Sequence, residues 1–275
     1  MKKVPKKVRI GIVGCGAIGS RIARSVNQEL KKDCALKAIC DIDARKVYAL
    51  SLELGEKNIA KKSYNDLLEN CDLVVEAVNA QNTQGIVRQA LQARKHILAM
   101  SVGKLLNGQA LFKLAEKNKC KILIPSGAIA GIDAIKAASL KGINQITLIT
   151  RKPPSGFASN TYFKEKGINL FDINSEKVIF EGDVNTAVKL FPQNINVAAT
   201  IALACGLKDK ILIRIMTSQT YTMNSHEIEV SGDFGKMVSR TDNVVCPDNP
   251  KTSYLAVLSA IQTLKQFFQE VKIGT

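Results

Sequence analysis

The sequence has no tryptophan, few other aromatic residues and only two histidines among its 275 residues. Aromatic residues make up 5% of the chain, which argues against the stacked-base platforms of proteins that bind single-stranded nucleic acid. The seven cysteines include no Cys-x-x-Cys pair, so the spacing of a structural zinc site is missing and no metal is expected. An odd number of cysteines without metal-ligand spacing indicates free thiols in a reducing compartment, and we expect a cytoplasmic protein.

Long apolar runs are also missing. No stretch reaches the roughly 20 apolar residues that a membrane-spanning helix needs, and the basic start of the chain leads into a glycine-interrupted segment rather than a secretion signal. The net charge is +15, but the basic residues are spread along the whole chain. We therefore expect no membrane partner, no nucleic-acid partner and a surface that attracts small anionic substrates and cofactors.

The first part of the chain alternates short apolar segments with amphipathic ones. The apolar segments are rich in β-branched residues and predict buried strands, whereas the segments between them have helical periodicity. This alternation is typical of α/β proteins of the Rossmann class, with a doubly wound parallel sheet covered on both faces. Strands are predicted over residues 8–13, 35–40, 72–78, 96–100 and 121–124, and helices over 17–30, 44–54, 63–69, 83–93 and 108–118.

The pattern changes near Pro125, and strand-like segments then predominate. We expect a dinucleotide-binding domain at residues 1–125 and a second, α+β domain at 126–245 that serves substrate binding and dimerisation. Residues 250–272 are expected to complete the first domain as a helix. The second domain is predicted to hold strands over 146–151, 177–181, 210–216 and 227–230 and a helix over 196–205, and the last helix to span 252–269 with Leu255, Leu258, Ile261, Leu264 and Phe268 on one face.

Three glycines, Gly14, Gly16 and Gly19, follow the first predicted strand and open the first predicted helix. In a dinucleotide-binding βαβ unit the first glycine makes the tight turn, the second lets the pyrophosphate approach, and the third lets the helix pack on the strand. The start of the helix, with Ala17 and Ile18 in its first turn, offers free N–H groups to the phosphates. The spacing therefore predicts a nicotinamide dinucleotide as cofactor.

Asp41 ends the second predicted strand, where a carboxylate accepts hydrogen bonds from the adenosine ribose and repels a 2′-phosphate. It favours NAD over NADP, although Arg45 one helical turn later would soften that preference, so NADP stays an alternative. Ligands of doubly wound sheets bind beyond the carboxyl ends of the strands. Two further strands have polar residues at their carboxyl ends, namely Glu76 and Asn79 at one and the segment 101–104 at the other. We expect this rim of the sheet to hold the nicotinamide ribose.

Proton transfer near neutral pH is most often carried out by histidine, and the chain offers only His96 and His226. His96 starts the predicted strand 96–100 directly after a helix end, and it is interpreted as a loop or helix-terminus residue. His226 lies just before a segment in which apolar residues alternate with polar ones, so its side chain points to one face of a strand. A structural histidine and a catalytic histidine both fit this position. Asn196 begins a predicted helix, where an N-cap is the plain interpretation.

Four segments together resemble the L-aspartate dehydrogenase family over nearly the full length of the chain. They are the glycine turn at 14–19, the sequence SGAIAGID at 126–133, the sequence FPQNINVAAT at 191–200 and the sequence NSHEI at 224–228. The last three are far more specific than the glycine turn, which many dehydrogenases share.

The resemblance implies that His226 is the catalytic residue and that Ala130 and Asn196 contact the cofactor. Ala128 and Asn194 are the neighbouring alternatives for those two contacts. The implied reaction is oxidative deamination of L-aspartate to iminoaspartate, which water converts to oxaloacetate and ammonia or which passes on to pyridine nucleotide biosynthesis. The enzyme is expected to be a homodimer. Two substrate carboxylates need cationic or N–H partners, and the sequence does not single one out.

Two other classes of function remain as alternatives. One is a different two-domain NAD(P)-dependent oxidoreductase that resembles the dihydrodipicolinate reductases or the homoserine dehydrogenases, although the paired histidines of the former are missing. The other is a non-catalytic NAD-binding sensor, which would need the glycine turn but not His226. Turnover of L-aspartate that depends on His226 separates the proposed enzyme from both.

Overall fold

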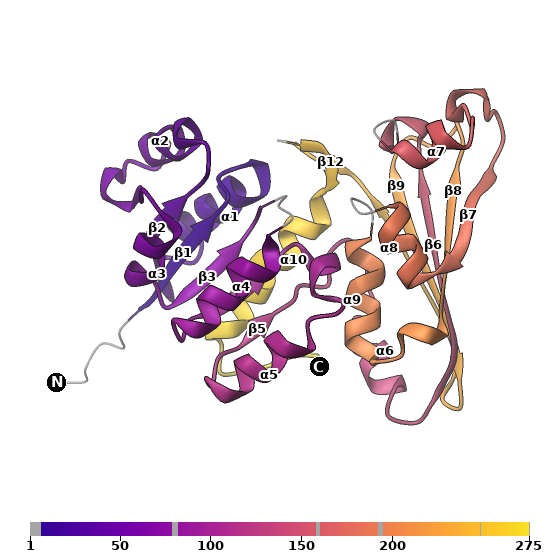
Figure 1. The fold of residues 1–275 in the computed structure, drawn as a ribbon. Helices are drawn as coiled ribbons and strands as arrows, with labels where there is room; N and C mark the ends of the chain where they lie inside the picture. Colours follow the sequence, from indigo (N-terminus) through magenta and orange to yellow (C-terminus); the bar gives the residue numbers. More distant parts are fainter. Residues whose placement is uncertain (1–6, 79–81, 158–159, 192–194, 248, 275) are drawn as a thin grey trace. The chain divides into compact units, whose positions relative to one another are not determined.

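The structure is a computed structural model that describes residues 7–78, 82–157, 160–191, 195–247 and 249–274, with the backbone alone at 249–251. The chain forms two compact units (Figure 1). One unit comprises Met1–Pro125 and Ala260–Val271, and the other comprises Ser126–Ser259 and Lys272–Thr275.

The first unit alternates strands with helices along the chain. Its elements are β1 (Val8–Val13), α1 (Ala17–Gln28), β2 (Cys34–Cys40), α2 (Ala44–Glu53), α3 (Tyr64–Asn70), β3 (Leu73–Glu76), α4 (Thr83–Gln92), β4 (His96–Ala99), α5 (Gln109–Lys117) and β5 (Ile122–Leu123). The strands form one sheet in the order β2-β1-β3-β4-β5, and all neighbours are parallel. Ile12, Val74 and Leu98 have no exposed surface, as expected of strands covered on both faces. The predicted doubly wound class is confirmed.

The strand order of this sheet reverses between β1 and β3, because β2 lies on one side of β1 and the later strands lie on the other. In doubly wound sheets a ligand binds beyond the carboxyl ends of the strands at such a switch point. The segments after β1 and β3 meet there, since the Ala77 N–H donates to the Val13 carbonyl at 2.9 Å. The fold thus places the glycine turn at the switch point.

The second unit is built on a mixed five-stranded sheet. Its elements are α6 (Ile132–Ala138), β6 (Ile143–Lys152), α7 (Thr161–Glu165), β7 (Lys177–Asp183), α8 (Val184–Leu190), α9 (Asn196–Cys205), β8 (Ile211–Thr217), β9 (Asn224–Gly232), β10 (Gly235–Asn243), β11 (Val245–Cys246), β12 (Asn249–Ser253) and the start of α10 (Tyr254–Phe268). The strand order is β10-β9-β6-β8-β7, in which β6 and β8 are parallel and the other neighbours are antiparallel. This sheet confirms the predicted α+β class.

The two faces of the second sheet differ in character. Figure 1 shows α6, α8 and α9 on the same side of this sheet, and the face beneath them is called the covered face below. Leu148 is paired with Ile213 and Ile228 on that face, and all three are buried. The opposite face carries charge, for example the ion pair between Arg151 and Glu227 at 3.0 Å. Because residues alternate between faces, these paired residues fix the register of the sheet.

Strand β10 was not predicted from the sequence. Its residues, GKMVSRTDN, include few apolar side chains, and along the strand half-buried residues alternate with exposed ones until Asn243. This is the pattern of an edge strand with little core contact, and it carries a weak hydrophobic signal. Pairing with β10 on one side and β6 on the other lets β9 begin at Asn224, before the predicted start.

The last helix is shorter than predicted, and its buried stripe shares Leu264 with the predicted one but not Leu255 or Leu258. Helix α10 spans Tyr254–Phe268, and Val257, Ala260 and Leu264 have no exposed surface. Leu255 and Leu258, which the predicted stripe included, are 37% and 42% exposed. The prediction selected large apolar side chains and therefore left out the small side chain of Ala260, which belongs to the buried stripe.

Candidate active site

The glycine turn joins β1 to α1, and two of its three glycines are required by the fold. Gly14 has φ +98°, and a Cβ on it would lie 2.5 Å from the Ala77 carbonyl oxygen. A Cβ on Gly19 would lie 1.8 Å from the Gly14 carbonyl oxygen, so α1 can only pack this closely without a side chain there. Both contacts are far inside van der Waals distance.

Gly16 is different, because a Cβ on it would meet no atom of the described residues within 4 Å. It is the N-cap residue of α1, with φ −76° and ψ −170°, and no side chain caps the helix. The first N–H groups of α1, in the turn that holds Ala17 and Ile18, therefore have no acceptor within the helix. An open space in front of these N–H groups fits a phosphate, which explains a glycine that the fold itself does not need.

Asp41, which follows β2, is hydrogen-bonded to the glycine turn. Its Oδ2 accepts a hydrogen bond from the Cys15 N–H at 2.7 Å, and its Oδ1 accepts one from the Asp43 N–H at 2.9 Å. Arg45 instead pairs with Asp43, at 3.0 and 3.1 Å. Beside Asp41, the apolar side chain of Ile42 is fully exposed. A fixed carboxylate next to an exposed apolar surface suits a ribose and its adenine base.

Glu76, expected at the ligand rim, instead connects the ends of β3 and β4. Its side chain has no exposed surface, and burial raises the pKa of its carboxyl group above the ordinary value. The carboxylate accepts hydrogen bonds from the N–H groups of Val78, Met100 and Ser101 at 3.0–3.2 Å, and from the Ser101 hydroxyl at 2.8 Å. Glu76 therefore holds together the two segments that form the rim, and its buried carboxylate does not face a ligand. Asn79 lies outside the described residues.

His226 lies inside β9, as its third residue, and not before the strand as the sequence suggested. Its side chain is 4% exposed, and its Nδ1 lies 3.1 Å from the hydroxyl oxygen of Thr150, the residue directly opposite on β6. Burial, together with the positive charge of Lys152, lowers the pKa of His226 to about 3. The imidazole is therefore neutral near pH 7. When Nδ1–H donates to Thr150, Nε2 keeps the lone pair that a general base needs.

The covered face of the second sheet changes from apolar to polar at the end that holds His226. Thr241, His226 and Thr150 lie side by side on β10, β9 and β6, and in the next row Asn243 is paired with Asn224. The sequence alone did not indicate this assembly, because the strands that meet here are far apart in the chain. The polar end, as this group is called below, comprises Thr150, Lys152, Thr217, Asn224, His226, Thr241 and Asn243.

The segment that contains Ala128 and Ala130 is anchored at this polar end. The Ala128 carbonyl accepts hydrogen bonds from the Thr241 hydroxyl at 2.7 Å and from the Asn243 amide at 3.1 Å. The Ala130 carbonyl accepts one from the Ser239 hydroxyl at 3.2 Å. The structure thus brings both candidate cofactor residues next to β10, one strand away from His226. Ala128 is buried, whereas Ala130 is exposed.

Asn196 and His96 take positions that differ from their plain interpretations. Asn196 is the first residue of α9 and is exposed, while Ile195 is the N-cap residue. His96 is the first residue of β4, where the predicted strand also begins, and it is not a loop or helix-terminus residue, because its N–H donates to the Asp72 carbonyl at 3.1 Å in the parallel sheet. Asn194, the alternative to Asn196, lies outside the described residues.

The buried imidazole makes stability depend on pH in a testable way. The pKa of His226 falls from an ordinary 6.5 to about 3, so below pH 6.5 the unfolded chain binds a proton that the native chain does not. The free energy of unfolding should therefore fall on acidification from pH 6.5 towards 3, by up to about 1.4 kcal/mol per pH unit. Urea unfolding at pH 7, 6 and 5 should show that a His226→Asn variant loses less stability than the wild type. An equal loss in both proteins would contradict the burial of a neutral imidazole.

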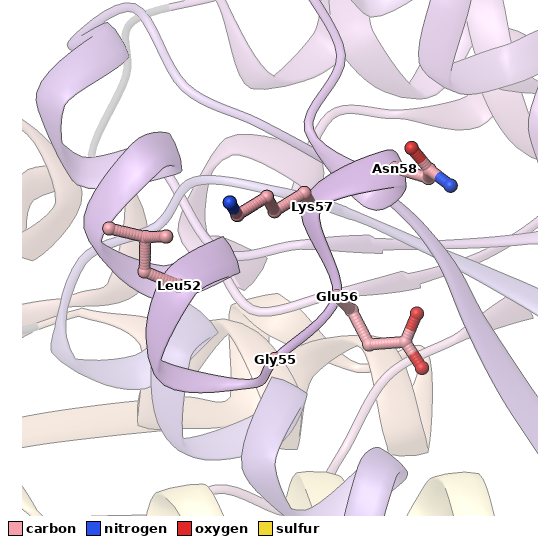
Figure 2. A pocket seen from close by; sticks show the side chains of 5 residues that line it. All are labelled: Leu52, Gly55, Glu56, Lys57 and Asn58. Carbon is pink, nitrogen blue, oxygen red and sulfur yellow. The ribbon is translucent and has the colours of Figure 1, made fainter.

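A surface hollow in the first unit does not belong to this chemistry. Figure 2 shows its lining, in which Lys57 extends towards Leu52 while Glu56 and Asn58 point away. The five lining residues are Leu52, Gly55, Glu56, Lys57 and Asn58. Leu52 lies in the last turn of α2, and the other four residues follow that helix, whose ten residues span about 15 Å and begin just after Asp43. The hollow thus lies at the end of α2 that is away from Asp41.

Among the described residues, no cluster of three or more His, Cys, Asp or Glu side chains could hold a metal ion. None of the helices formed by these residues is long and apolar enough to cross a membrane.

Comparison with known families gives one match for each part of the chain. Residues 133–267 match the family described as "Aspartate dehydrogenase, C-terminal". Residues 14–125 match the family described as "Homoserine dehydrogenase, NAD binding domain". The first match includes His226 and Asn196, and the second includes the glycine turn and Asp41.

Curated relatives match over almost the whole chain. An L-aspartate dehydrogenase from Methanosarcina mazei is 43% identical over 271 residues, which cover 98% of this chain and 100% of the relative. An L-aspartate dehydrogenase from Methanococcus maripaludis is 40% identical over 272 residues, with the same coverage of both chains.

Solved structures show the same fold at low sequence identity. The aspartate dehydrogenase of Thermotoga maritima has a TM-score of 0.73 at 22% identity and covers 98% of this chain and 100% of its own. A homoserine dehydrogenase from Thiobacillus denitrificans has a TM-score of 0.61 at 14% identity, covering 94% of this chain and 72% of its own. These likenesses establish the two-domain dehydrogenase fold.

Proposed function

The chain belongs to the L-aspartate dehydrogenase family, and we propose that it oxidises L-aspartate with NAD to iminoaspartate, which water converts to oxaloacetate and ammonia. The observation that carries this proposal is the neutral, buried imidazole of His226 at the polar end of the second sheet. A polar end with an amine, an imidazole, hydroxyls and amides suits a small polar substrate that must lose a proton.

The first unit is an NAD-binding domain, and its residues fit that cofactor. The open space at Gly16 and the free N–H groups at the start of α1 would hold the pyrophosphate, and the Asp41 carboxylate would hold the adenosine ribose. When bound, NAD supplies the acceptor for the hydride that leaves the substrate. We further propose that two residues of the second unit contact NAD. They are Ala130 and Asn196, or their neighbours Ala128 and Asn194.

The role of His226 follows from the chemistry of the amine. A hydride leaves the substrate Cα readily only when the attached amine is neutral, because its lone pair forms the new C=N bond. A neutral imidazole takes the proton from the ammonium group, and Thr150 at 3.1 Å fixes the ring. Hydrolysis of the imine then needs a base to activate water, and the same imidazole serves once it has given up its proton.

We propose NAD as the preferred cofactor over NADP. Both oxygens of Asp41 are held by backbone N–H groups, so the carboxylate is fixed where a 2′-phosphate would be repelled. Arg45, the residue expected to soften this preference, is tied to Asp43 by two hydrogen bonds. The pairing diverts its guanidinium from a 2′-phosphate.

The reduction of NAD and of NADP, followed at 340 nm with L-aspartate and a panel of other amino and hydroxy acids, tests the proposal. We expect NADH formation with L-aspartate, a smaller rate with NADP, and no reaction with L-homoserine. Reaction with L-homoserine and none with L-aspartate would overturn the substrate assignment while leaving the NAD-binding domain in place.

We also propose a cytoplasmic homodimer. All seven cysteines are free thiols, as expected in a reducing compartment. The face of the second sheet opposite the covered face has Val178 and Val238 exposed by 42% and 68%. It also pairs Arg214 with Glu181 at 2.6 Å. A mixed apolar and ion-paired surface on a sheet suits association with a second copy of the chain.

A further inference from the structure

Lys152 is the last residue of β6 and lies on the covered face, next to His226. Thr150 is directly opposite His226 on β9, and Lys152 follows two residues later, opposite Thr217 on β8. Since alternate strand residues share a face, Thr150, Lys152 and His226 point to the same side of the sheet. The amine is near enough to His226 for its charge to lower the imidazole pKa.

The position of the lysine side chain is constrained by its surroundings. Lys152 is half-buried, and its stem packs against Gly156, where an added Cβ would lie 3.4 Å from the Lys152 Cβ and 3.5 Å from its Cδ. Burial lowers the pKa of its amine to about 8, so the group is still mostly charged at pH 7. A packed stem holds the charge in place and reduces the entropy lost on binding a ligand.

The charge on the covered face has one sign. Arg151, the neighbour of Lys152, points to the opposite face and pairs there with Glu227 at 3.0 Å and Glu176 at 3.4 Å. On the covered face, the described residues of β6, β8, β9 and β10 include no Asp or Glu, and the other polar side chains that these strands contribute at the polar end are hydroxyls, amides and an imidazole. This part of the sheet therefore suits an anion supplied by a ligand.

We propose that Lys152 binds a carboxylate of the dicarboxylic substrate and holds its amine against His226. This inference rests on the proposed function, because it assigns a role in the binding of the same substrate. The lysine is a binding residue and His226 the base. The positive charge of Lys152 also favours the neutral form of the imidazole. Lys152 therefore binds the substrate carboxylate and also keeps His226 in the unprotonated form that can accept a proton.

Three variants test the assignment. Lys152→Met keeps the length of the side chain and removes its charge, Lys152→Arg keeps the charge, and Lys236→Met removes an exposed lysine from the other face of the same sheet. We expect Lys152→Met to raise KM for L-aspartate by about 10- to 100-fold, the loss of a charge-assisted hydrogen bond, while NADH binding stays unchanged. Lys152→Arg should recover part of the loss, and Lys236→Met should behave as the wild type. Thermal unfolding of each variant verifies its fold.

The pH dependence of KM adds a second readout. In the wild type, KM for L-aspartate should rise above about pH 8 as the Lys152 amine loses its proton. Of the other titratable groups on this face, His226 is already neutral there, and the exposed Lys177 on β7 is opposite Thr217. Lys152→Met should lack this additional rise above pH 8, whereas Lys177→Met should keep it. Retention of the full wild-type profile in Lys152→Met would overturn the proposal.

Direct binding separates this inference from the proposed function. Calorimetric titration of the NADH-loaded protein with succinate, a dicarboxylate that cannot react, measures the carboxylate site without turnover. Weaker succinate binding in Lys152→Met than in the wild type supports the assignment even if the amino acid oxidised proves not to be L-aspartate. Equal succinate binding in both proteins, with L-aspartate turnover intact, would overturn the role of Lys152 and leave the proposed function standing.

Discussion

A His226→Asn variant is expected to lose about 10²- to 10⁴-fold in kcat with L-aspartate, because the substrate amine loses its general base. Asparagine leaves a side-chain amide where Nδ1 faces the Thr150 hydroxyl, so the local pairing of β6 and β9 should persist. NADH binding should stay at the wild-type level, since the residues expected to hold the pyrophosphate and the adenosine ribose belong to the first unit. Steady-state kinetics and a fluorescence titration with NADH measure the two quantities separately.

The same substitution at the other histidine is the matched control. His96 begins β4, where its Nδ1 accepts a hydrogen bond from the Lys121 N–H at 3.0 Å and its ring packs against Phe267 with centroids 5.3 Å apart. These are structural contacts, so His96→Asn should lower the melting temperature and leave kcat nearly unchanged. Full activity in His226→Asn, or an equal loss in both variants, would show that His226 is not the base.

The glycine turn could be predicted from the sequence because its determinants are local. Gly14, Gly16 and Gly19 lie within one strand–turn–helix unit, and Asp41 directly follows the next strand, β2. The central strands β1, β3 and β4 are short, mostly apolar runs that are largely buried on both faces, and such runs between helical segments give a strong sequence signal. The family resemblance then added His226, which the local pattern alone could not distinguish from a structural histidine.

The surroundings of His226 could not be predicted, because they depend on pairing between distant segments. Thr150 and His226 are 76 residues apart in the chain and meet only through the register of β6 and β9. Strand β10, which carries Thr241 beside His226, has too few apolar residues for a period-two signal. Long-range register is set by the packing of the whole sheet rather than by any one strand.

Lys152 shows the same limit for charge. The chain has 39 lysines and arginines, and nothing in the local sequence distinguishes a lysine that faces a buried imidazole from one that faces water. Its importance becomes visible only when the structure places it on the covered face, two residues beyond Thr150. Burial and a neighbouring titratable group then mark it as a site residue.

Two glycine-to-alanine substitutions in the glycine turn distinguish a glycine that the fold needs from a glycine that cofactor binding needs. Gly19→Ala places a Cβ 1.8 Å from the Gly14 carbonyl oxygen, so α1 must move away from β1. Overpacking of this kind costs about 1–3 kcal/mol or more, and here the obstacle is backbone. We expect a large loss of stability in urea unfolding, together with lost NADH binding.

Gly16→Ala should behave in the opposite way. Its Cβ meets nothing within 4 Å in the part of the chain that the structure describes, and φ −76° with ψ −170° is open to alanine. The free energy of unfolding without nucleotide should change by less than about 1 kcal/mol, the usual cost of an N-cap change. NADH affinity should nevertheless fall by at least about 10-fold, because the added methyl group takes the space through which the pyrophosphate approaches the N–H groups of α1. Wild-type NADH affinity in Gly16→Ala would mean that the pyrophosphate does not approach the backbone there. The third possible result, a loss of stability as large as that of Gly19→Ala, would mean that the space in front of Gly16 serves packing rather than a ligand.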